Sequence, residues 1–349
     1  MLSYRKLAMR VLGRPLHTGG IDSPRPASQR AAAFILTAVM LTTLAAPAFA
    51  GTWSIENGDI TVKAGETGND VTQNNVTTKN DTDTIITNSD KDTASSHTVT
   101  IETNDKNDKV EVTLDNVNIK ADSGSALTSK GDVTLTLKGD NSLTGGNGGS
   151  GISSSGSLTI SGGENNSLTA QGGSGSGIFS SGGVTISGGT VNATGGTGGT
   201  GENSNGGSGI YIYSSSGSLT VSGGTVTANG GSGGGNGGDG ISSTNTTISG
   251  GSTVTANGGN GGSLVGGDGI RSGGGLTVSD GTVTAKGGNG DSKDGYGGDG
   301  IRSGGVVTIS GNTVNAAGGY GGKVGGYGIC SFDRVAISGG TVEAAGGNG

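Results

Sequence analysis

The chain is poor in the residues that build and cross-link an ordinary compact domain. Its 349 residues include one cysteine, four prolines, 3% aromatic side chains and 13% charged side chains, whereas average proteins carry roughly 25% charged residues. Cys330 alone cannot form an internal disulfide. All four prolines precede residue 51, so no proline interrupts a later strand. With hydrophobic residues at only 29%, the composition excludes an ordinary compact globular domain.

Glycine dominates instead. Of the 80 glycines, 70 lie in the 205 residues from Gly145 to Gly349, which makes that stretch one-third glycine. Collagen has the same fraction, but it needs glycine at every third residue and abundant proline, so collagen is excluded. Val, Ile, Leu and Thr recur at fixed intervals between the glycines, and this regularity argues against a disordered chain.

The first fifty residues have the parts of a secretory signal. Residues 1–30 carry six Lys or Arg and one acid, residues 31–46 are apolar, and Pro47-Ala48-Phe49-Ala50 ends in the small-residue pattern of a cleavage site. The apolar run is shorter than the roughly 20 residues of a membrane span, which favours cleavage over a permanent anchor. We therefore predict residues 1–50 to be a signal peptide, removed after Ala50, and the mature protein to be secreted or held at the cell surface.

The remaining chain is acidic. Residues 51–349 carry 26 Asp or Glu and 14 Lys or Arg, a net charge of −12, and the leader's +5 brings the whole chain to −7. Phosphate contacts need clustered Lys and Arg, and no such cluster is present. We expect no nucleic-acid partner.

A repeat of about 29 residues begins near residue 109. Each unit carries a Gly-Ile marker or its equivalent, followed by a phrase such as VTISGG and another such as TVTA. Both phrases alternate apolar and polar residues, as strands with one buried face do. Three short strands per unit, each ended by glycine, predict one coil of a parallel β-helix. The markers are Leu127, Ile152, Ile178, Ile210, Ile241, Ile270, Ile301 and Ile329.

The predicted fold is all-β, a right-handed parallel β-helix of about eight to nine coils with glycine-rich loops over residues 109–349. We expect residues 51–108, which are rich in Asn, Asp and Thr, to form an irregular N-terminal cap that protects the first edge. The sequence ends at Gly349 inside a loop, so either a truncated sequence or end-to-end association with another copy is expected there. The side chains predicted to point inward in one coil are Ile270, Leu276, Val278, Val283 and Ala285.

The succession VEVTLDNVNIKADSGSALTSKGDVTLTLKGDNSLTGG, followed by repeated VTISGGTV and GDGI phrases, resembles a known family. It is similar to the secreted bacterial carbohydrate-binding domain-containing right-handed β-helix proteins, over about residues 109–349. The resemblance implies a surface-associated protein that binds plant or acidic polysaccharide, with a pectate-lyase-like fold, calcium sites and no demonstrated turnover. This chain departs from the family in its long GG-rich loops, and the family's acidic pair before Gly-Ile is only Gly-Asp here.

Stacked coils bring equivalent positions into columns, and one column is acidic. Asp239, Asp268 and Asp299 each lie two residues before a marker isoleucine. Three carboxylates so close repel one another unless they are neutralised, and Ca²⁺ with oxygen ligands is one hypothesis. The alternative is that they are turn residues, solvated or paired with Arg271 and Arg302.

The residue after each marker forms a second, outward column. Phe179 and Tyr211, with Tyr213 two residues on, predict an aromatic platform, and Arg271 next to Arg302 predicts a cationic step. A sugar chain would stack on the aromatic rings, and a uronate carboxylate would pair with the guanidinium groups. Ordinary side-chain packing between coils explains the same residues without a ligand.

Catalysis has little support. His97 is the only histidine after residue 50 and lies in the polar cap region, and we find no Ser/His/Asp set, no metal-spaced His or Cys, and no phosphate loop. The sequence favours an exported, non-catalytic carbohydrate-binding or adhesion β-helix. The alternative is the passenger or stalk of an autotransporter-type surface adhesin. A polysaccharide lyase, with Arg302 as base beside Asp-bound calcium, ranks third.

Overall fold

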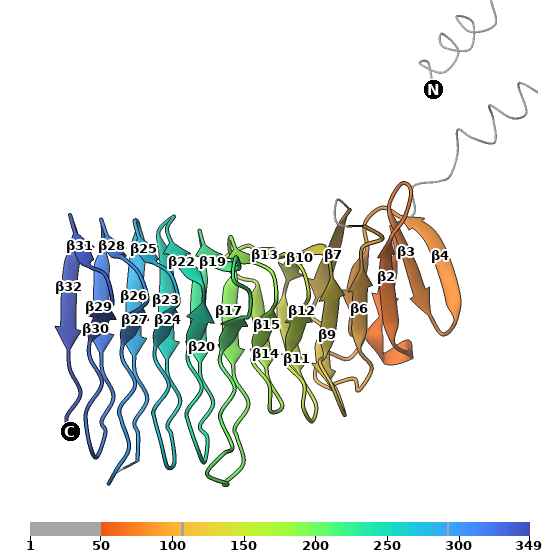
Figure 1. Ribbon diagram of the computed structural model, residues 1–349. Helices are drawn as coiled ribbons and strands as arrows, with labels where there is room; N and C mark the ends of the chain where they lie inside the picture. Colours follow the sequence, from red (N-terminus) through yellow and green to blue (C-terminus); the bar gives the residue numbers. More distant parts are fainter. Residues whose placement is uncertain (1–49, 106–107, 292) are drawn as a thin grey trace, which may run out of the picture. The chain divides into compact units, whose positions relative to one another are not determined.

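The computed structural model describes residues 50–349 except 106, 107 and 292. The predicted signal peptide lies outside the described residues apart from Ala50. The described residues belong to one compact unit, and its strands stack into successive coils (Figure 1). No helix in the described ranges is long and apolar enough to cross a membrane.

Three parallel sheets run the length of the stack, and each of nine coils contributes one strand to each sheet. Sheet A contains the first strand of every coil. Its strands are β6 (Val99–Glu102), β9 (Leu127–Lys130), β12 (Ile152–Ser154), β15 (Ile178–Ser180), β18 (Ile210–Ile212), β21 (Ile241–Ser243), β24 (Ile270–Ser272), β27 (Ile301–Ser303) and β30 (Ile329–Ser331).

Sheets B and C contain the second and third strands of the coils. Sheet B consists of β7 (Lys109–Asp115), β10 (Asp132–Lys138), β13 (Leu158–Gly162), β16 (Val184–Ile186), β19 (Ser218–Val221), β22 (Asn245–Ile248), β25 (Leu276–Val278), β28 (Val307–Ile309) and β31 (Val335–Ile337). Sheet C consists of β8 (Asn118–Lys120), β11 (Asp140–Thr144), β14 (Ser167–Gln171), β17 (Thr190–Thr194), β20 (Thr225–Asn229), β23 (Ser252–Asn257), β26 (Gly281–Lys286), β29 (Thr313–Ala317) and β32 (Thr341–Ala345). This architecture confirms the predicted all-β parallel solenoid.

The N-terminal region extends and closes two of these sheets. Strands β1 and β5 continue sheet B in parallel, and β2 continues sheet A before β3 and β4 turn antiparallel at its outer edge. An antiparallel edge of this kind shields the first coil from edge-to-edge pairing. The elements are β1 (Thr52–Ser54), the 3₁₀ turn η1 (Ile55–Asn57), β2 (Ile60–Ala64), β3 (Asn69–Gln73), β4 (Val76–Asp81) and β5 (Ile85–Thr87).

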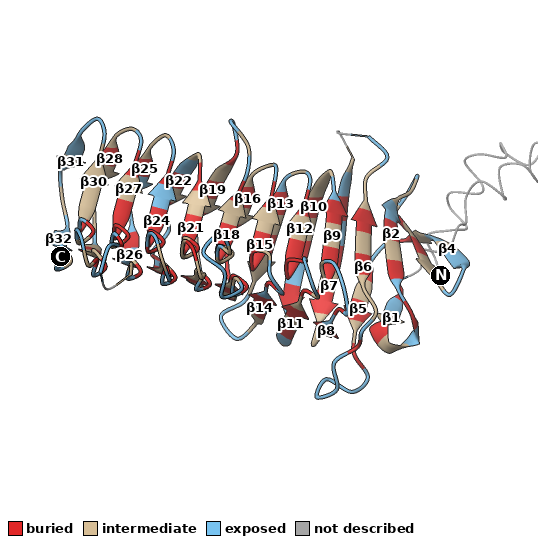
Figure 2. Cartoon of the chain, turned by 60° about the horizontal axis from the view of Figure 1, so that its bottom comes forward, coloured by how far each residue is buried: buried red, intermediate tan, exposed pale blue. Residues whose placement is uncertain are grey.

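The core is a column of small aliphatic side chains inside the three sheets. The five side chains predicted to point inward in the seventh coil are all fully buried, and the neighbouring outward Thr277 is exposed. This alternation of buried and more exposed positions recurs from coil to coil (Figure 2). Each coil buries little apolar area alone, so stacking is what supplies a continuous core.

A second inward column, of serine, lies beside the isoleucines in sheet A. Its members sit two residues after the marker. Five of them donate hydrogen bonds from their hydroxyl groups to backbone carbonyl groups at the corner of the same or the preceding coil, whereas Ser129 Oγ has no hydrogen-bond partner among the described residues. Ser272 Oγ, for example, donates to the Gly275 carbonyl oxygen at 2.7 Å. These bonds give the buried hydroxyl groups acceptors inside the fold. The buried members are Ser129, Ser154, Ser180, Ser243, Ser272 and Ser303.

The glycine-rich loops form an ordered layer beneath the sheets, and Figure 1 shows them side by side. The Gly259 amide donates to the Gly238 carbonyl, Gly267 donates to Gly259, and Gly288 donates to Gly267, each at 2.8 Å. The two legs of one loop are thus bonded to each other and to the next loop. A Cβ atom at Gly288 would lie 2.0 Å from the Gly259 carbonyl oxygen, so this packing requires glycine.

Gly288→Ala is expected to open this layer while leaving the sheets intact. The added methyl group meets backbone rather than a movable side chain, and overpacking of this kind costs about 1–3 kcal/mol. Hydrogen exchange measured by mass spectrometry should show faster exchange in the loop residues 258–269 and 287–291, and unchanged exchange in the intervening strands β24, β25 and β26. Gly273→Ala is the control, because its nearest neighbour would lie at 3.8 Å. Equal protection in both variants would contradict the proposed role of glycine.

Candidate functional site

The register of sheet A places the predicted outward residues in one straight column. Phe179 pairs with Tyr211, and Arg271 pairs with Arg302, each on neighbouring strands. Ser242 lies between Tyr211 and Arg271. The aromatic and cationic parts are therefore separated by one coil, with Tyr211 and Arg271 two rungs, or about 10 Å, apart at the backbone.

The aromatic part is a continuous surface of three rings. The centroids of Phe179 and Tyr211 lie 5.8 Å apart at an interplanar angle of 62°, and those of Tyr211 and Tyr213 lie 6.0 Å apart. These separations are those of favourable aromatic pairs. Tyr213 is 67% exposed, while Phe179 and Tyr211 are half-buried. Burial raises the pKa of Tyr211, and nearby Tyr213 and Asp239 add to that rise.

The cationic part consists of Arg271 and Arg302. Arg271 is exposed and forms no ion pair with any residue that the structure describes. Arg302 lies 3.4 Å from the carboxylate of Asp299, and its guanidinium carbon lies 5.1 Å from the centroid of the Phe332 ring. Phe332 is 68% exposed and was not among the residues predicted from the sequence. The signal was its spacing, because it follows Cys330 by two residues, as Tyr213 follows Tyr211.

We name this surface the basic-aromatic stripe. It comprises Phe179, Tyr211, Tyr213, Arg271, Arg302 and Phe332.

The three aspartates form the predicted column, but their carboxylates are used within the fold. The Asp268 amide donates to Asp239 Oδ1 and the Asp299 amide donates to Asp268 Oδ1, both at 2.8 Å. The Tyr327 amide then donates to Asp299 Oδ1 at 2.7 Å. Each carboxylate therefore accepts the peptide N–H of the next coil and acts as a rung between coils.

Burial dominates the electrostatics of this column. Desolvation raises the pKa of Asp268 to about 7, with the charges of Asp239 and Asp299 adding to the rise. Burial also raises the pKa of Asp239, and the hydrogen bond from the Asp268 amide and the charge of Arg271 oppose that rise. Protonation and the arginines outside the column thus reduce the repulsion between carboxylates stacked one coil apart.

The residues present fit pairing with arginine better than they fit a calcium site. Among the residues that the structure describes, no group of three or more His, Cys, Asp or Glu could hold a metal ion. Asp299 divides its oxygens between the Tyr327 amide and Arg302, which matches the alternative of arginine pairing. The calcium implied by the family resemblance stays a prediction.

No protein-family model, curated protein or solved structure matches this chain. The parallel β-solenoid therefore rests on the structure itself, and the family resemblance remains a hypothesis from sequence.

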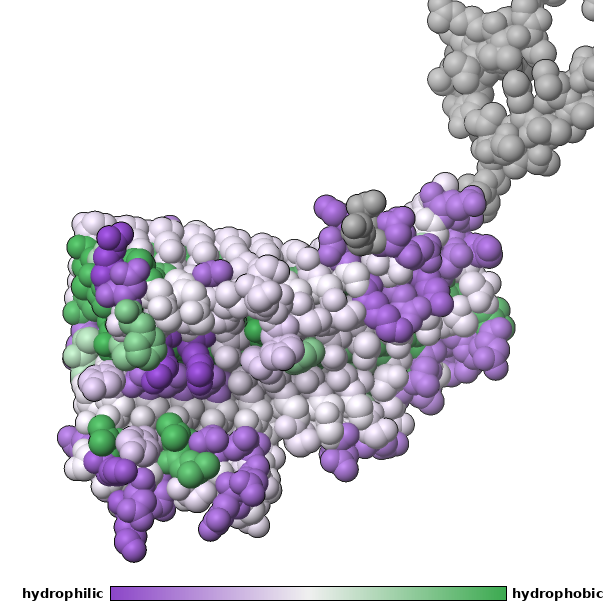
Figure 3. Space-filling model, viewed as in Figure 1, coloured by the Kyte–Doolittle hydropathy of each residue, from purple (hydrophilic) through white to green (hydrophobic). Residues whose placement is uncertain are grey.

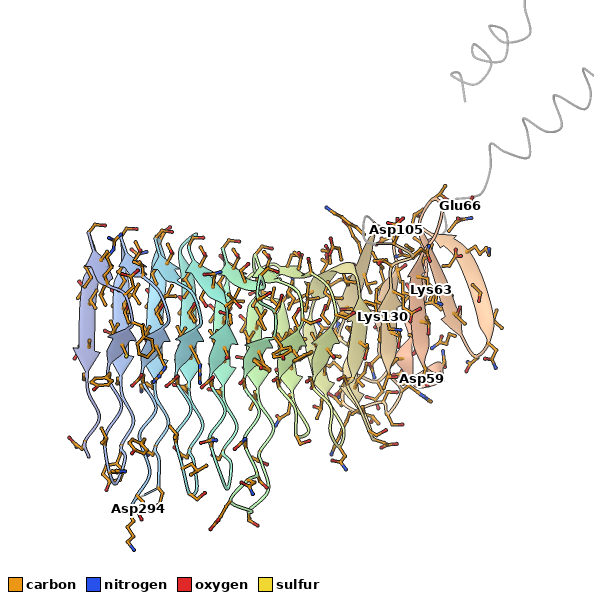
Figure 4. All side chains as sticks on the ribbon, viewed as in Figure 1. Asp59, Lys63, Glu66, Asp105, Lys130 and Asp294 are labelled. Atoms are coloured by element: carbon orange, nitrogen blue, oxygen red, sulfur yellow. The ribbon has the colours of Figure 1, made fainter. Side chains whose placement is uncertain are left out.

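Two further clusters lie outside the stripe. At the N-terminal end of the stack, Glu102 on β6 pairs with Lys63 on β2 at 3.0 Å and with Lys130 on β9 at 2.7 Å. Figure 4 labels the two lysines. These bonds and pairs lower the pKa of Glu102. His97 lies 3.6 Å from Asp59 in the same region, which gives it a charged partner rather than a catalytic set.

The tips of the last glycine loops carry exposed apolar and aromatic side chains, which Figure 3 shows in part as green patches below the sheets. Lys323 Nζ lies 5.1 Å from the Tyr296 ring centroid. The sequence pattern did not indicate this cluster, because the loops vary in length and composition from one repeat to the next. Its apolar and aromatic members are Leu264, Val265, Tyr296, Tyr320 and Val324.

The aspartate column predicts a specific pH dependence. The pKa of the Asp268 carboxyl group is about 7 in the folded chain and about 3.9 in the unfolded chain. At pH values between these two, the folded state therefore binds more protons than the unfolded state. Stability therefore falls as pH rises from about 4 to about 7. Asp268→Asn should remove this part of the decline, because the amide oxygen still accepts the Asp299 N–H while no charge forms. The check is thermal unfolding of both proteins from pH 4 to 8. Parallel curves for the two proteins would rule out the raised pKa.

Proposed function

We propose that this protein is an exported, non-catalytic module that binds acidic polysaccharide along the basic-aromatic stripe. The observation that carries this proposal is the in-register column on sheet A, where an aromatic platform and two neighbouring guanidinium groups face outward on one straight surface. Export follows from the predicted signal sequence, and the acidic glycan class agrees with the family resemblance.

The chemistry of the stripe matches such a ligand. The apolar face of a sugar ring packs on an aromatic ring, and a uronate carboxylate accepts two parallel hydrogen bonds from a guanidinium group. Arg271 is exposed for this purpose. Arg302 is held in place from two sides, by Asp299 and by the Phe332 ring. Because a linear polysaccharide is itself a repeat, a column spanning several coils can contact several sugar units at once.

Sodium polygalacturonate is the probe that tests this proposal. We expect residues 51–349 to bind it, and Arg271→Gln with Arg302→Gln to weaken binding at least tenfold, since hydrogen bonds to charged groups contribute about 1.5–3 kcal/mol each. Phe179→Ala with Tyr211→Ala should abolish the binding that remains at high salt, because stacking is not screened. Biolayer interferometry on the immobilised polymer measures both effects.

Matched controls separate the stripe from general charge. Arg334→Gln removes an exposed arginine that is not part of the stripe and should leave affinity unchanged. Highly methyl-esterified pectin lacks most free carboxylates and should bind weakly to the unaltered protein. Unchanged affinity in both stripe variants would end the proposal.

Calcium enters as a separate arm of the same experiment. The family resemblance implies calcium at Asp239, Asp268 and Asp299, whereas the contacts of these residues favour binding without it. If binding survives EDTA, the stripe alone accounts for recognition. If EDTA abolishes it, and Ca²⁺ but not Mg²⁺ restores it, the aspartate column is a calcium site and recognition includes that ion.

The second candidate function is a stalk or adhesin passenger. It is favoured by strand β31, where Val335 and Ile337 are 44% and 54% exposed at the edge of sheet B. An apolar edge of this kind accepts further strands, from a longer chain or from another copy. A folded protein that is silent on a broad glycan array but self-associates in sedimentation velocity would favour this role. Release of unsaturated oligosaccharides from polygalacturonate would instead revive the lyase.

A further inference from the structure

A buried carboxylate in the cap region receives three hydrogen bonds. Asp81, the last residue of β4, is fully buried. Its Oδ1 accepts the Gly51 backbone N–H at 2.8 Å and the Asp83 N–H at 3.3 Å, and its Oδ2 accepts the Trp53 indole N–H at 2.8 Å. This carboxylate thus joins the start of β1 to the end of β4.

Asp81 has hydrogen-bond donors around it but no ion-pair partner among the residues that the structure describes. A buried carboxylate without an opposite charge is costly even when it is hydrogen-bonded. A cation at this position would therefore be stabilising, and of the two backbone donors to Oδ1 the Gly51 nitrogen lies nearer, at 2.8 Å against 3.3 Å for the Asp83 nitrogen.

The predicted cleavage bond ends at that nitrogen. Ala50 is exposed and Gly51 is buried, so the environment of the chain changes at the Ala50–Gly51 peptide bond. Hydrolysis of this bond by a signal peptidase consumes one water, leaves a carboxylate on Ala50 and gives Gly51 a free amine, which is protonated at neutral pH.

We propose that signal cleavage supplies the missing cation: the new α-ammonium group of Gly51 pairs with the buried Asp81 carboxylate and locks the N-terminal cap. The inference rests on the proposed export and cleavage. It needs no rearrangement, because the Gly51 nitrogen is already 2.8 Å from Oδ1. The Gly51 carbonyl is fixed as well, since it accepts the Ile85 N–H at 2.9 Å.

Trp53 reports on this pair directly. It is the only tryptophan of the chain, and its indole N–H is bonded to the other oxygen of Asp81. Tryptophan fluorescence therefore follows the unfolding of the cap, even if the coils unfold separately, as stacked repeats can.

A four-protein cycle tests the proposal. Two chains begin at Gly51, with Asp81 or with Asp81→Asn, and two begin at residue 48, so that Gly51 keeps a neutral peptide N–H. All four contain every strand and core residue described above. We expect the free amine to lower the unfolding equilibrium constant of the cap about tenfold with Asp81, since charge-assisted hydrogen bonds are about twice as strong as neutral ones. The amine should have no stabilising effect with Asp81→Asn. Equal effects in both backgrounds would overturn the proposal.

A pH arm keeps the test valid if Asp81→Asn fails to fold. The paired amine has a pKa above its unfolded value of about 7.7–8.0, so its contribution is complete below that value and is lost as pH rises through the folded pKa. The chain from Gly51 should lose cap stability at alkaline pH relative to the chain from residue 48. Asp83 adjoins Asp81, and Asp108, Lys109 and Glu111 line the same opening, but these groups are common to both chains and cancel. Identical pH profiles would contradict the ion pair.

Mass spectrometry separates the failure of export from the failure of this pair. The exported product of the full chain should have the mass of residues 51–349. A different mass overturns the cleavage on which the lock depends in the cell, whereas the cycle still measures whether an amine at Gly51 and Asp81 interact.

Discussion

The hydrogen bonds between successive coils are the constraint on which the rest of this molecule depends. Each strand pairs in parallel, in register, with its equivalent in the next coil, so a residue type that recurs in the repeat becomes a straight column at about 4.8 Å spacing. A column of Ile or Val fills the interior, and a column of Ser donates hydrogen bonds to backbone carbonyl groups at the corners. The same rule places Phe179 on Tyr211 and Arg271 on Arg302, although these residues lie about one repeat apart in sequence.

Hydrogen bonds between successive coils continue beyond the strands in two ways. Where side chains are tolerated, Asp or Asn supplies an oxygen for the next coil's peptide N–H, as Asp268 does for Asp299 and as Asn260 does for Asn289. Where two legs of a loop approach too closely for any Cβ atom, glycine alone fits and the backbone bonds directly to itself. The acidic column and the glycine content, which look like separate features of the sequence, therefore serve one purpose. This also explains why three carboxylates can stack: the hydrogen bonds that they accept from peptide N–H groups and the two arginines outside them offset their repulsion.

Period-two alternation and the Gly-Ile marker were sufficient to predict the parallel solenoid and its inward residues, because both are properties of each repeat by itself. The stacking of Phe179, Tyr211 and Tyr213 was predictable for the same reason. The order of the glycine loops was not, since it arises from bonds between loops that differ in length and composition. Phe332 occupies the repeat position of Tyr213, so its spacing was a usable signal. The loop tips were not predictable, because they lie outside the repeating strands. The contact of Gly51 with Asp81 joins residues of the non-repeating region that no periodicity links.

The binding surface and the cap are connected through the mechanics of a stacked array. Each coil contacts only its neighbours, so such an array frays from its ends, and the order of an inner coil depends on the coils beyond it. The basic-aromatic stripe begins at the fourth coil, and β2, β3 and β4 close the N-terminal edge of the sheet that carries it. Contacts that stabilise the N-terminal edge of this sheet therefore also stabilise the strand register that aligns the residues of the stripe. Trp53, Asp81 and Gly51 tie the start of β1 to the end of β4 at this end of the molecule. A charge that forms only after the leader is removed would make the full rigidity of the binding surface a property of the mature protein.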